Sequence, residues 1–329
     1  MTQQELAVRM GRPLKTINEI INAKKSITQE TALELDRVLG VPAHIWTGLE
    51  ATYQMTLARN RERTFLESQE RWLKEFPVRE TERRGWIEKT PDTAYRVRVL
   101  LQFLGVASFD AWQKQPVAGY RVAAKYSREA MAGWLGAGVL EGNDTETAPY
   151  DEDRFTQALS RLRELTAEPP TVWKPLMETL CASAGVAVVF VPELPRSGAN
   201  GVARWLTPAK ALIQMSLCYK WADIFWFSFF HEAAHIRLHQ TRDVHIDGIG
   251  DADDYEEEAD RAAADLLIPR AQWDAFVADP ANFKAPSIGA FALDTGVAPG
   301  IVVGRLQFEK RVPYSSFVGL KEKYQWTEE

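Results

Sequence analysis

The chain has 329 residues, 46% of them hydrophobic and 26% charged, with a formal net charge of −6. This composition excludes a disordered chain, and the length predicts two or three domains. Two cysteines do not suggest a disulfide framework, no apolar run reaches the roughly 18 to 20 residues of a membrane span, and the N-terminus lacks a signal-peptide pattern, so we expect a cytoplasmic protein without a membrane partner.

The acidic charge is concentrated in one region. Residues 243–265 hold ten acids and one base, whereas residues 1–25 hold five bases and two acids. The net charge therefore does not exclude a nucleic-acid partner, because the N-terminal end is locally basic, as contact with phosphates requires.

Three helical patterns open the chain. The first covers residues 2–11 and begins with a capping box formed by Thr2 and Glu5, the second covers residues 13–22, and the third covers residues 28–40. Two short helices joined around a glycine have the outline of a helix-turn-helix.

The residues of this segment strengthen that interpretation. Residues 2–50, TQQELAVRMGRPLKTINEIINAKKSITQETALELDRVLGVPAHIWTGLE, resemble the phage-repressor type helix-turn-helix of HigA-class antitoxins. The resemblance implies that a homodimer reads a palindromic DNA operator, with the second helix in the major groove and the following loop on phosphates. The implied groove contacts are Pro13, Leu14, Lys15, Thr16 and Asn18, and the implied backbone contacts are Asn22, Lys24 and Lys25.

A charged, helical region follows. A connecting helix is predicted from Ala51 to about Glu70, and residues 59–98 carry eleven bases and eight acids. We interpret these charges as a solvated, paired face, with a second DNA surface as the alternative. Further amphipathic helices are predicted at residues 95–104, around Phe109 and Trp112, and at 126–135, 155–165 and 172–183, with a loop at 142–149. Trp112 and Trp134 are expected in the core.

The periodicity then changes to that of strands. Val186 to Val191 is a β-branched run, and two further short strands are predicted at residues 201–205 and 211–215. This small sheet comes directly before the helix that carries His231-Glu232-x-x-His235, an order that resembles the zincin arrangement, in which the edge strand would hold an extended substrate. Arg204 and Trp205 either line that cleft or form a stacked surface pair.

The next segment contains His231-Glu232-x-x-His235 on an apolar helix. Residues four apart share a helix face, so both imidazoles can bind one metal ion. Glu232 lies one position further round, where it can take a proton from metal-activated water. Four of the five histidines fall within residues 231–245, which argues against coincidence.

A third ligand is predicted on a helix at residues 251–269. Glu256 and Asp260 share a face, so Glu256 can complete the site while Asp260 orients a ligand histidine. The neighbouring acids, including Glu257 and Glu258, are interpreted as a solvated first turn.

Three more polar side chains lie near this motif in the sequence, namely His239, His245 and Tyr255. His239 lies two turns beyond His231, about 12 Å along the axis, too far to be a fourth ligand. It is interpreted as a structural histidine, and His239, His245 and Tyr255 are the nearest candidates to stabilise an oxyanion.

The HEAAH motif followed by EEEADRAAADLLIP resembles the ImmA/IrrE family of metallopeptidases, with Ala262 where that family usually has Phe. The resemblance implies a Zn²⁺ site with Glu256 as third ligand, and a protein substrate, typically a repressor or toxin-antitoxin component cleaved in a stress or phage response. In the last segment, 288–308, residues 292–306 imitate a helix-turn-helix, and we interpret them as packing under the metal site.

We therefore predict a mainly α protein with a small β-sheet (α+β). Its expected domains are a helix-turn-helix bundle at residues 1–55, a helical middle region at 56–170 and a zincin-like metallopeptidase at 171–329. The leading hypothesis is a DNA-binding zinc metallo-endopeptidase that regulates transcription. The alternative is a non-proteolytic repressor or antitoxin with a structural zinc site.

Overall fold

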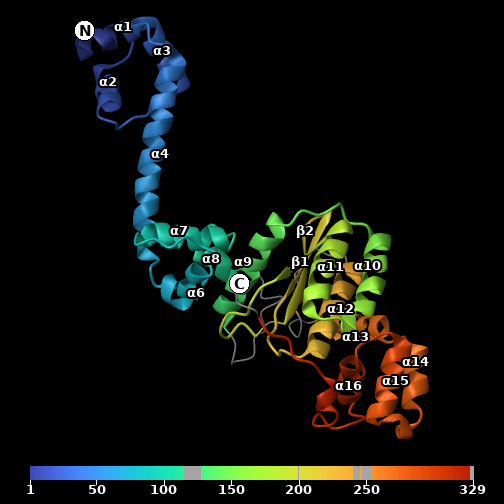
Figure 1. Ribbon diagram of the computed structural model, residues 1–329. Coiled ribbons are helices and arrows are strands. Elements are labelled where there is room, and N and C mark those ends of the chain that lie inside the picture. Colours follow the sequence, from blue (N-terminus) through green and yellow to red (C-terminus); the bar gives the residue numbers. More distant parts are fainter. Residues whose placement is uncertain (115–126, 199, 240–244, 247–252, 327–329) are drawn as a thin grey trace. The chain divides into compact units, whose positions relative to one another are not determined.

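A computed structural model describes residues 1–114, 127–198, 200–239, 245–246 and 253–326 (Figure 1). Its contacts divide the chain into two compact units. One comprises Met1–Arg71 with Pro91–Val97, and the other comprises Trp72–Thr90 with Arg98–Glu329. Each unit is described by itself.

The first unit begins with the three predicted helices, α1 (Gln3–Met10), α2 (Leu14–Ile21) and α3 (Gln29–Leu39). The predicted capping box at Thr2 and Glu5 is present, and Gly11 ends α1 at φ 64°, a left-handed conformation that glycine adopts without strain. The helices enclose a small core of Ala7, Met10, Ile17 and Leu35.

The long helix α4 (Ala43–Ser68) completes the first unit. Our prediction that this helix starts at Ala51 was wrong by eight residues, because the chain turns into it directly after Pro42. Asp36 at the end of α3 accepts a hydrogen bond from the Ala43 amide at 3.1 Å and so caps the new helix.

The second unit contains α5 (Trp72–Glu75), α6 (Val78–Arg83) and α8 (Phe109–Lys114), while α7 (Thr93–Phe103) crosses the division between the units. Aromatic side chains hold the short helices together. Trp72 stacks on Phe109 with ring centroids 4.6 Å apart, and Trp112 lies edge-on to Phe76 at 4.9 Å. Trp112 is buried in this cluster, as predicted.

A four-stranded sheet lies at the centre of this unit. Its strands are β1 (Val186–Phe190), β2 (Gly201–Thr207), β3 (Lys210–Met215) and β4 (His245–Ile246), in the order β1-β3-β2-β4. β1 is parallel to β3, and β2 is antiparallel to both β3 and β4. The first three strands were predicted, whereas β4 was missed because two residues give no periodicity.

Helices cover both faces of the sheet (Figure 1). Successive residues of β1 point to opposite faces of the sheet. Val188 packs with α11 (Pro170–Ser183) and α12 (Ala222–Leu238), and Val189 packs with α9 (Arg128–Asp144) on the other face. The helix α10 (Glu152–Glu164) lies beside α11.

The helix α9 differs from its prediction. We expected a helix at residues 126–135 and a loop from Gly142, but the helix continues to Asp144. Gly138 and Gly142 let it lie directly on β3: a Cβ built on Gly138 would meet the Gln214 side chain at 1.8 Å, and one on Gly142 would meet Leu212 at 2.9 Å. This close packing outweighs the low helix propensity of glycine.

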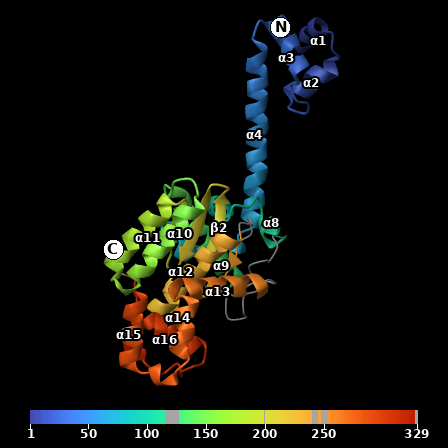
Figure 2. The same cartoon turned by 90° about the vertical axis from the view of Figure 1, so that its right-hand side faces the viewer.

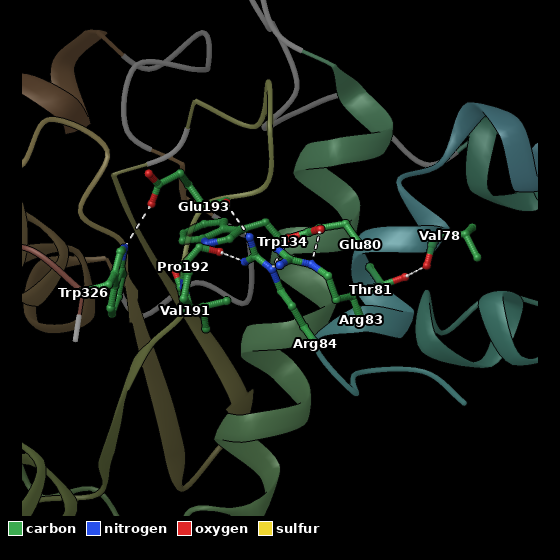
Figure 3. Close-up of polar contacts among 10 residues, drawn as sticks. All are labelled: Val78, Glu80, Thr81, Arg83, Arg84, Trp134, Val191, Pro192, Glu193 and Trp326. Atoms are coloured by element: carbon green, nitrogen blue, oxygen red, sulfur yellow. Dashed lines mark hydrogen bonds and ion pairs between the residues drawn. The ribbon is translucent and has the colours of Figure 1, made fainter. Parts of the chain in front are cut away.

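Polar contacts join α6 and α9 to the chain that leaves β1 (Figure 3). The Arg84 guanidinium donates to the carbonyls of Pro192 at 2.6 Å and Glu193 at 3.1 Å. The Trp134 indole donates to the carbonyl of Val191 at 3.0 Å, and Glu80 accepts from Arg84 at 2.7 Å. Trp134 is fully buried, as predicted.

The helix α13 (Asp253–Leu267) packs against α12. The helices α14 (Arg270–Val277), α15 (Ala285–Thr295) and α16 (Pro299–Phe308) follow it and lie at one end of this unit (Figure 2). Within the described ranges, 3-10 helices are at Leu165–Ala167, Pro280–Asn282 and Val318–Leu320. α16 packs against α12, as predicted. No single helix in the described ranges has the length and apolarity of a membrane span, and one helix pair, α15 with α16, meets that test only jointly, with a bend of 113°.

Candidate metal centre

The two histidines of the motif lie together on α12. His231 and His235 are one turn apart, and their Nε2 atoms are 3.0 Å from each other. Both residues are buried, at 2% and 1% exposure, because α12 packs between the sheet and the C-terminal helices. The helix therefore presents two imidazole nitrogens to one point in the protein interior.

The helix α13 brings a carboxylate to the same point. The Glu256 oxygens lie 3.3 Å from His231 Nε2 and 3.5 Å from His235 Nε2. Two small residues on the packed face of α13, Ala259 and Ala263, are fully buried and allow the helices to approach closely. The donor atoms of all three residues lie within 4.8 Å of one another.

The spacing of these atoms fits a zinc ion. Zinc binds nitrogen and carboxylate oxygen at about 2.0 to 2.2 Å, so ligands at tetrahedral corners are roughly 3.3 to 3.6 Å apart. The two distances from Glu256 to the histidine nitrogens, 3.3 and 3.5 Å, fall within that range, and the distance of 3.0 Å between the two nitrogens is slightly shorter. Two imidazoles and one carboxylate also match the ligand set of catalytic zinc sites, which leave the fourth position open.

The Nδ1 atoms of His231 and His235 each contact a further polar side chain. His231 Nδ1 lies 2.9 Å from Asp260 Oδ1, so Asp260 contacts one of the two motif histidines, as the sequence predicts. His235 Nδ1 lies 3.0 Å from His239 Nδ1. Tyr255 packs its ring edge-on against His239, with centroids 4.7 Å apart.

The structure changes the interpretation of Glu258. The sequence suggested a solvated acid, but Glu258 Oε2 lies 3.2 Å from His239 Nε2. The contact spans nineteen residues of sequence, so no local pattern indicates it. The side chain of the other candidate, His245, lies outside the described residues.

Glu232 is fully buried next to the first residue of β2. A Cβ built on Gly201 would lie 2.9 Å from Glu232 Cγ and 3.0 Å from Oε1. The adjacent Asn200 donates to Ser228 Oγ at 3.2 Å, which joins the start of β2 to α12 one turn before Glu232. Sequence reasoning missed Gly201, for which a glycine opening a predicted strand was the available signal.

For Trp205, a residue of β2, the sequence left open a place in a substrate cleft or a stacked surface pair with Arg204. Trp205 is half-buried, and its ring packs edge-on against Tyr150 with centroids 4.9 Å apart. Trp205 therefore packs onto the core beside Tyr150.

The residues proposed to contact DNA lie on α2 and the loop after it. Most of them are exposed, and Lys15 has a side-chain exposure of 83%. Thr16 and Asn18 are half-buried, and the Asn18 carbonyl accepts from the Asn22 amide side chain at 2.8 Å. Ile17 is buried in the core, so the opposite face of α2 is directed towards solvent. The exposed residues of this set are Pro13, Leu14, Lys15, Asn22, Lys24 and Lys25.

Comparison with known proteins identifies this N-terminal part. Residues 1–46 match the helix-turn-helix family model. No curated protein matches the chain. The protein thus carries an N-terminal helix-turn-helix of the phage-repressor type, in a mostly helical fold with a small sheet, and the match supports a role as a DNA-binding transcription regulator.

Proposed function

We propose that this protein is a DNA-binding zinc metallo-endopeptidase. The observation that carries the proposal is the convergence of His231, His235 and Glu256 on one buried point, with Glu232 next in sequence to the first ligand. The spacing of residues in the sequence independently selects the same three ligands.

Glu232 supplies the acid-base chemistry in this proposal. Bound zinc would polarise the scissile carbonyl and lower the pKa of a water molecule at its open position. Glu232 would accept the proton of that water and later donate it to the leaving amine. Its complete burial beside Gly201 excludes bulk solvent from the carboxylate and restricts its motion.

The substrate that we propose is another protein. The resemblance of the metal-site motifs to ImmA/IrrE peptidases suggests a repressor or a toxin-antitoxin component. The N-terminal helix-turn-helix would place the peptidase at an operator, so that DNA binding and cleavage act on the same regulatory circuit.

Profiling of protein N-termini tests the endopeptidase activity even while the substrate is unidentified. Cells producing wild type should contain new N-termini that are missing in cells producing Glu232→Gln at equal abundance. Identical N-terminal profiles for the two proteins would reject the peptidase assignment.

The second candidate is a repressor or antitoxin whose zinc site is structural. Structural zinc sites usually have four protein ligands, whereas the described residues bring together three. This observation favours a catalytic site. Full transcriptional repression by Glu232→Gln, together with the identical profiles described above, would favour the structural alternative.

We further propose that the protein acts as a homodimer joined through α4. Residues 51–58 of this helix form two turns without a charged side chain, and Leu49 and Tyr53, which are four residues apart on one helix face, are 59% and 40% exposed. An isolated helix needs an apolar face packed on a partner, and helix-turn-helix modules read paired half-sites, so a second copy is the favoured partner.

Light scattering during size-exclusion chromatography tests the dimer. Tyr53→Lys should give a monomer, while the matched change Val8→Lys, at an apolar residue of α1 that is 72% exposed, should leave the dimer intact. Equal masses for Tyr53→Lys and wild type would exclude this face of α4 as the interface.

A further inference from the structure

His239 is a buried histidine, and each of its two ring nitrogens contacts another side chain. It ends α12 and is 6% exposed. Its Nδ1 lies 3.0 Å from His235 Nδ1, and its Nε2 lies 3.2 Å from Glu258 Oε2. The three side chains thus form a continuous line from a metal ligand to a carboxylate that is 53% exposed.

The facing nitrogens restrict where the protons are. Two Nδ1 atoms at 3.0 Å form a hydrogen bond only if one carries a proton and the other accepts it. A neutral imidazole that gives the Nε2 lone pair to a metal keeps its proton on Nδ1. His235 is therefore the donor when Nε2 binds a metal, and His239 is the acceptor.

The direction of this first hydrogen bond also determines the tautomer of His239 and its hydrogen bond with Glu258. With Nδ1 unprotonated, the neutral His239 ring carries its proton on Nε2, which donates to the Glu258 carboxylate. The opposite direction would place the His235 proton on Nε2 and block metal binding. An ionised carboxylate only accepts hydrogen bonds, so Glu258 selects the direction that leaves His235 Nε2 free for the metal.

His231, the other proposed ligand, is also held by a carboxylate, but without an imidazole in between. His231 Nδ1 contacts Asp260 Oδ1 directly at 2.9 Å. Each histidine of the centre is thus oriented by a carboxylate, which fixes its tautomer and raises its basicity as a ligand. For His235 this effect passes through one further imidazole.

We propose that His239 is a positioning residue of the metal centre, which relays the effect of Glu258 to His235 and thereby raises metal affinity. The proposal rests on the metal centre proposed above. Loss of such an outer partner typically weakens metal binding by about 10- to 100-fold. His239→Phe keeps a buried ring but removes both hydrogen bonds, and Glu258→Ala removes the carboxylate at the exposed end.

Two further variants separate the relay from a packing effect. In His239→Asn the side-chain oxygen can take the place of Nδ1 as acceptor from His235, but the ring nitrogen that faces Glu258 is lost, so this variant should recover only part of the affinity lost in His239→Phe. Glu257→Ala is the matched control for Glu258→Ala, because Glu257 is the adjacent exposed acid and no described side chain contacts its carboxylate.

The test is a zinc titration of the full chain at one pH, in competition with a chromophoric chelator. His239→Phe and Glu258→Ala should bind zinc about 10- to 100-fold more weakly than wild type, His239→Asn should lie between His239→Phe and wild type, and Glu257→Ala should remain near wild type. Thermal unfolding of the metal-free proteins reports the purely structural contribution of each side chain.

The outcomes distinguish the relay from the metal centre itself. Unchanged zinc affinity in both Glu258→Ala and His239→Phe, with wild type binding normally and His235→Ala not binding, would overturn the relay and leave the centre intact. Equal loss in Glu257→Ala and Glu258→Ala would also overturn it, since that would be an effect of general charge. A wild-type chain that binds no zinc would overturn both.

Discussion

The backbone of Gly201 lies against the side chain of Glu232, so closely that a Cβ at position 201 would stand 2.9 Å from Glu232 Cγ. The general base proposed on α12 therefore has its position defined by the first residue of β2. This close contact links the sheet to the chemistry of the site.

Gly201→Ala should displace Glu232 and leave the metal ligands in place. A displacement near 1 Å can reduce catalysis by about 100-fold, and overpacking should lower stability by about 1 to 3 kcal/mol. Cleavage rate and zinc content are measured together. Gly289→Ala is the control, because a Cβ there meets nothing within 4 Å. Wild-type cleavage by Gly201→Ala would show that Glu232 needs no such restraint.

Glu256→Gln should lose zinc affinity by more than the roughly 10- to 100-fold that removal of an outer partner costs. The reason is that an amide is a much weaker zinc ligand than the carboxylate now 3.3 and 3.5 Å from the two histidine nitrogens. Glu257→Gln is the control in the same competition titration. A loss in Glu257→Gln with none in Glu256→Gln would shift the ligand by one residue and refute the observed register.

Replacing Lys24 and Lys25 by Ala should weaken binding to every DNA sequence. Each lysine that contacts a phosphate contributes about 0.9 to the salt dependence of the affinity, so the double variant should lower that slope by roughly 2. Lys15→Ala should instead reduce discrimination between operator and random DNA. Anisotropy titrations at several salt concentrations measure both effects, and unchanged salt dependence in the double variant would remove the loop from the interface.

The parts of the fold and site predicted from sequence are those that depend on local spacing. The capping box of Thr2 and Glu5 marks α1, and four-residue spacing places His231 with His235 and Glu256 with Asp260 on common helix faces. Such patterns extend over at most a few helical turns, which is the distance that periodicity can report.

What the sequence did not predict depends on packing between distant segments. The contact of His239 with Glu258 and the contact of Gly201 with Glu232 join residues nineteen and thirty-one positions apart. The extension of α9 through Gly142 likewise depends on β3, because glycine alone favours a helix end.

Glu80 should contribute stability that depends on pH. Hydrogen bonds from Arg83 and Arg84 lower the pKa of Glu80 from 4.5 to about 2, against the opposing effect of burial. A lowered pKa in the folded state means that the stabilisation is complete above pH 4.5 and is lost as the pH falls towards 2. Arg84 also holds the chain after β1, so this loss should loosen the contacts shown in Figure 3.

Glu80→Gln should therefore lower the stability of the second unit by about 1 kcal/mol at pH 7, and the difference should shrink towards pH 2. Glu164→Gln is the control, because that acid is 63% exposed in its ion pair with Arg161. Thermal unfolding midpoints at several pH values provide the measurement. A difference between Glu80→Gln and wild type that stays constant with pH would contradict the assigned cause.

The most direct test of the metal centre is zinc analysis combined with X-ray absorption spectroscopy of the zinc-loaded wild type. The expected result is about one zinc per chain, surrounded by nitrogen and oxygen at about 2.0 to 2.2 Å, with two imidazoles in the shell. His231→Ala should lose the metal. A protein that retains no zinc, or a shell with sulfur at about 2.3 Å from Cys181 or Cys218, would contradict the site formed by His231, His235 and Glu256.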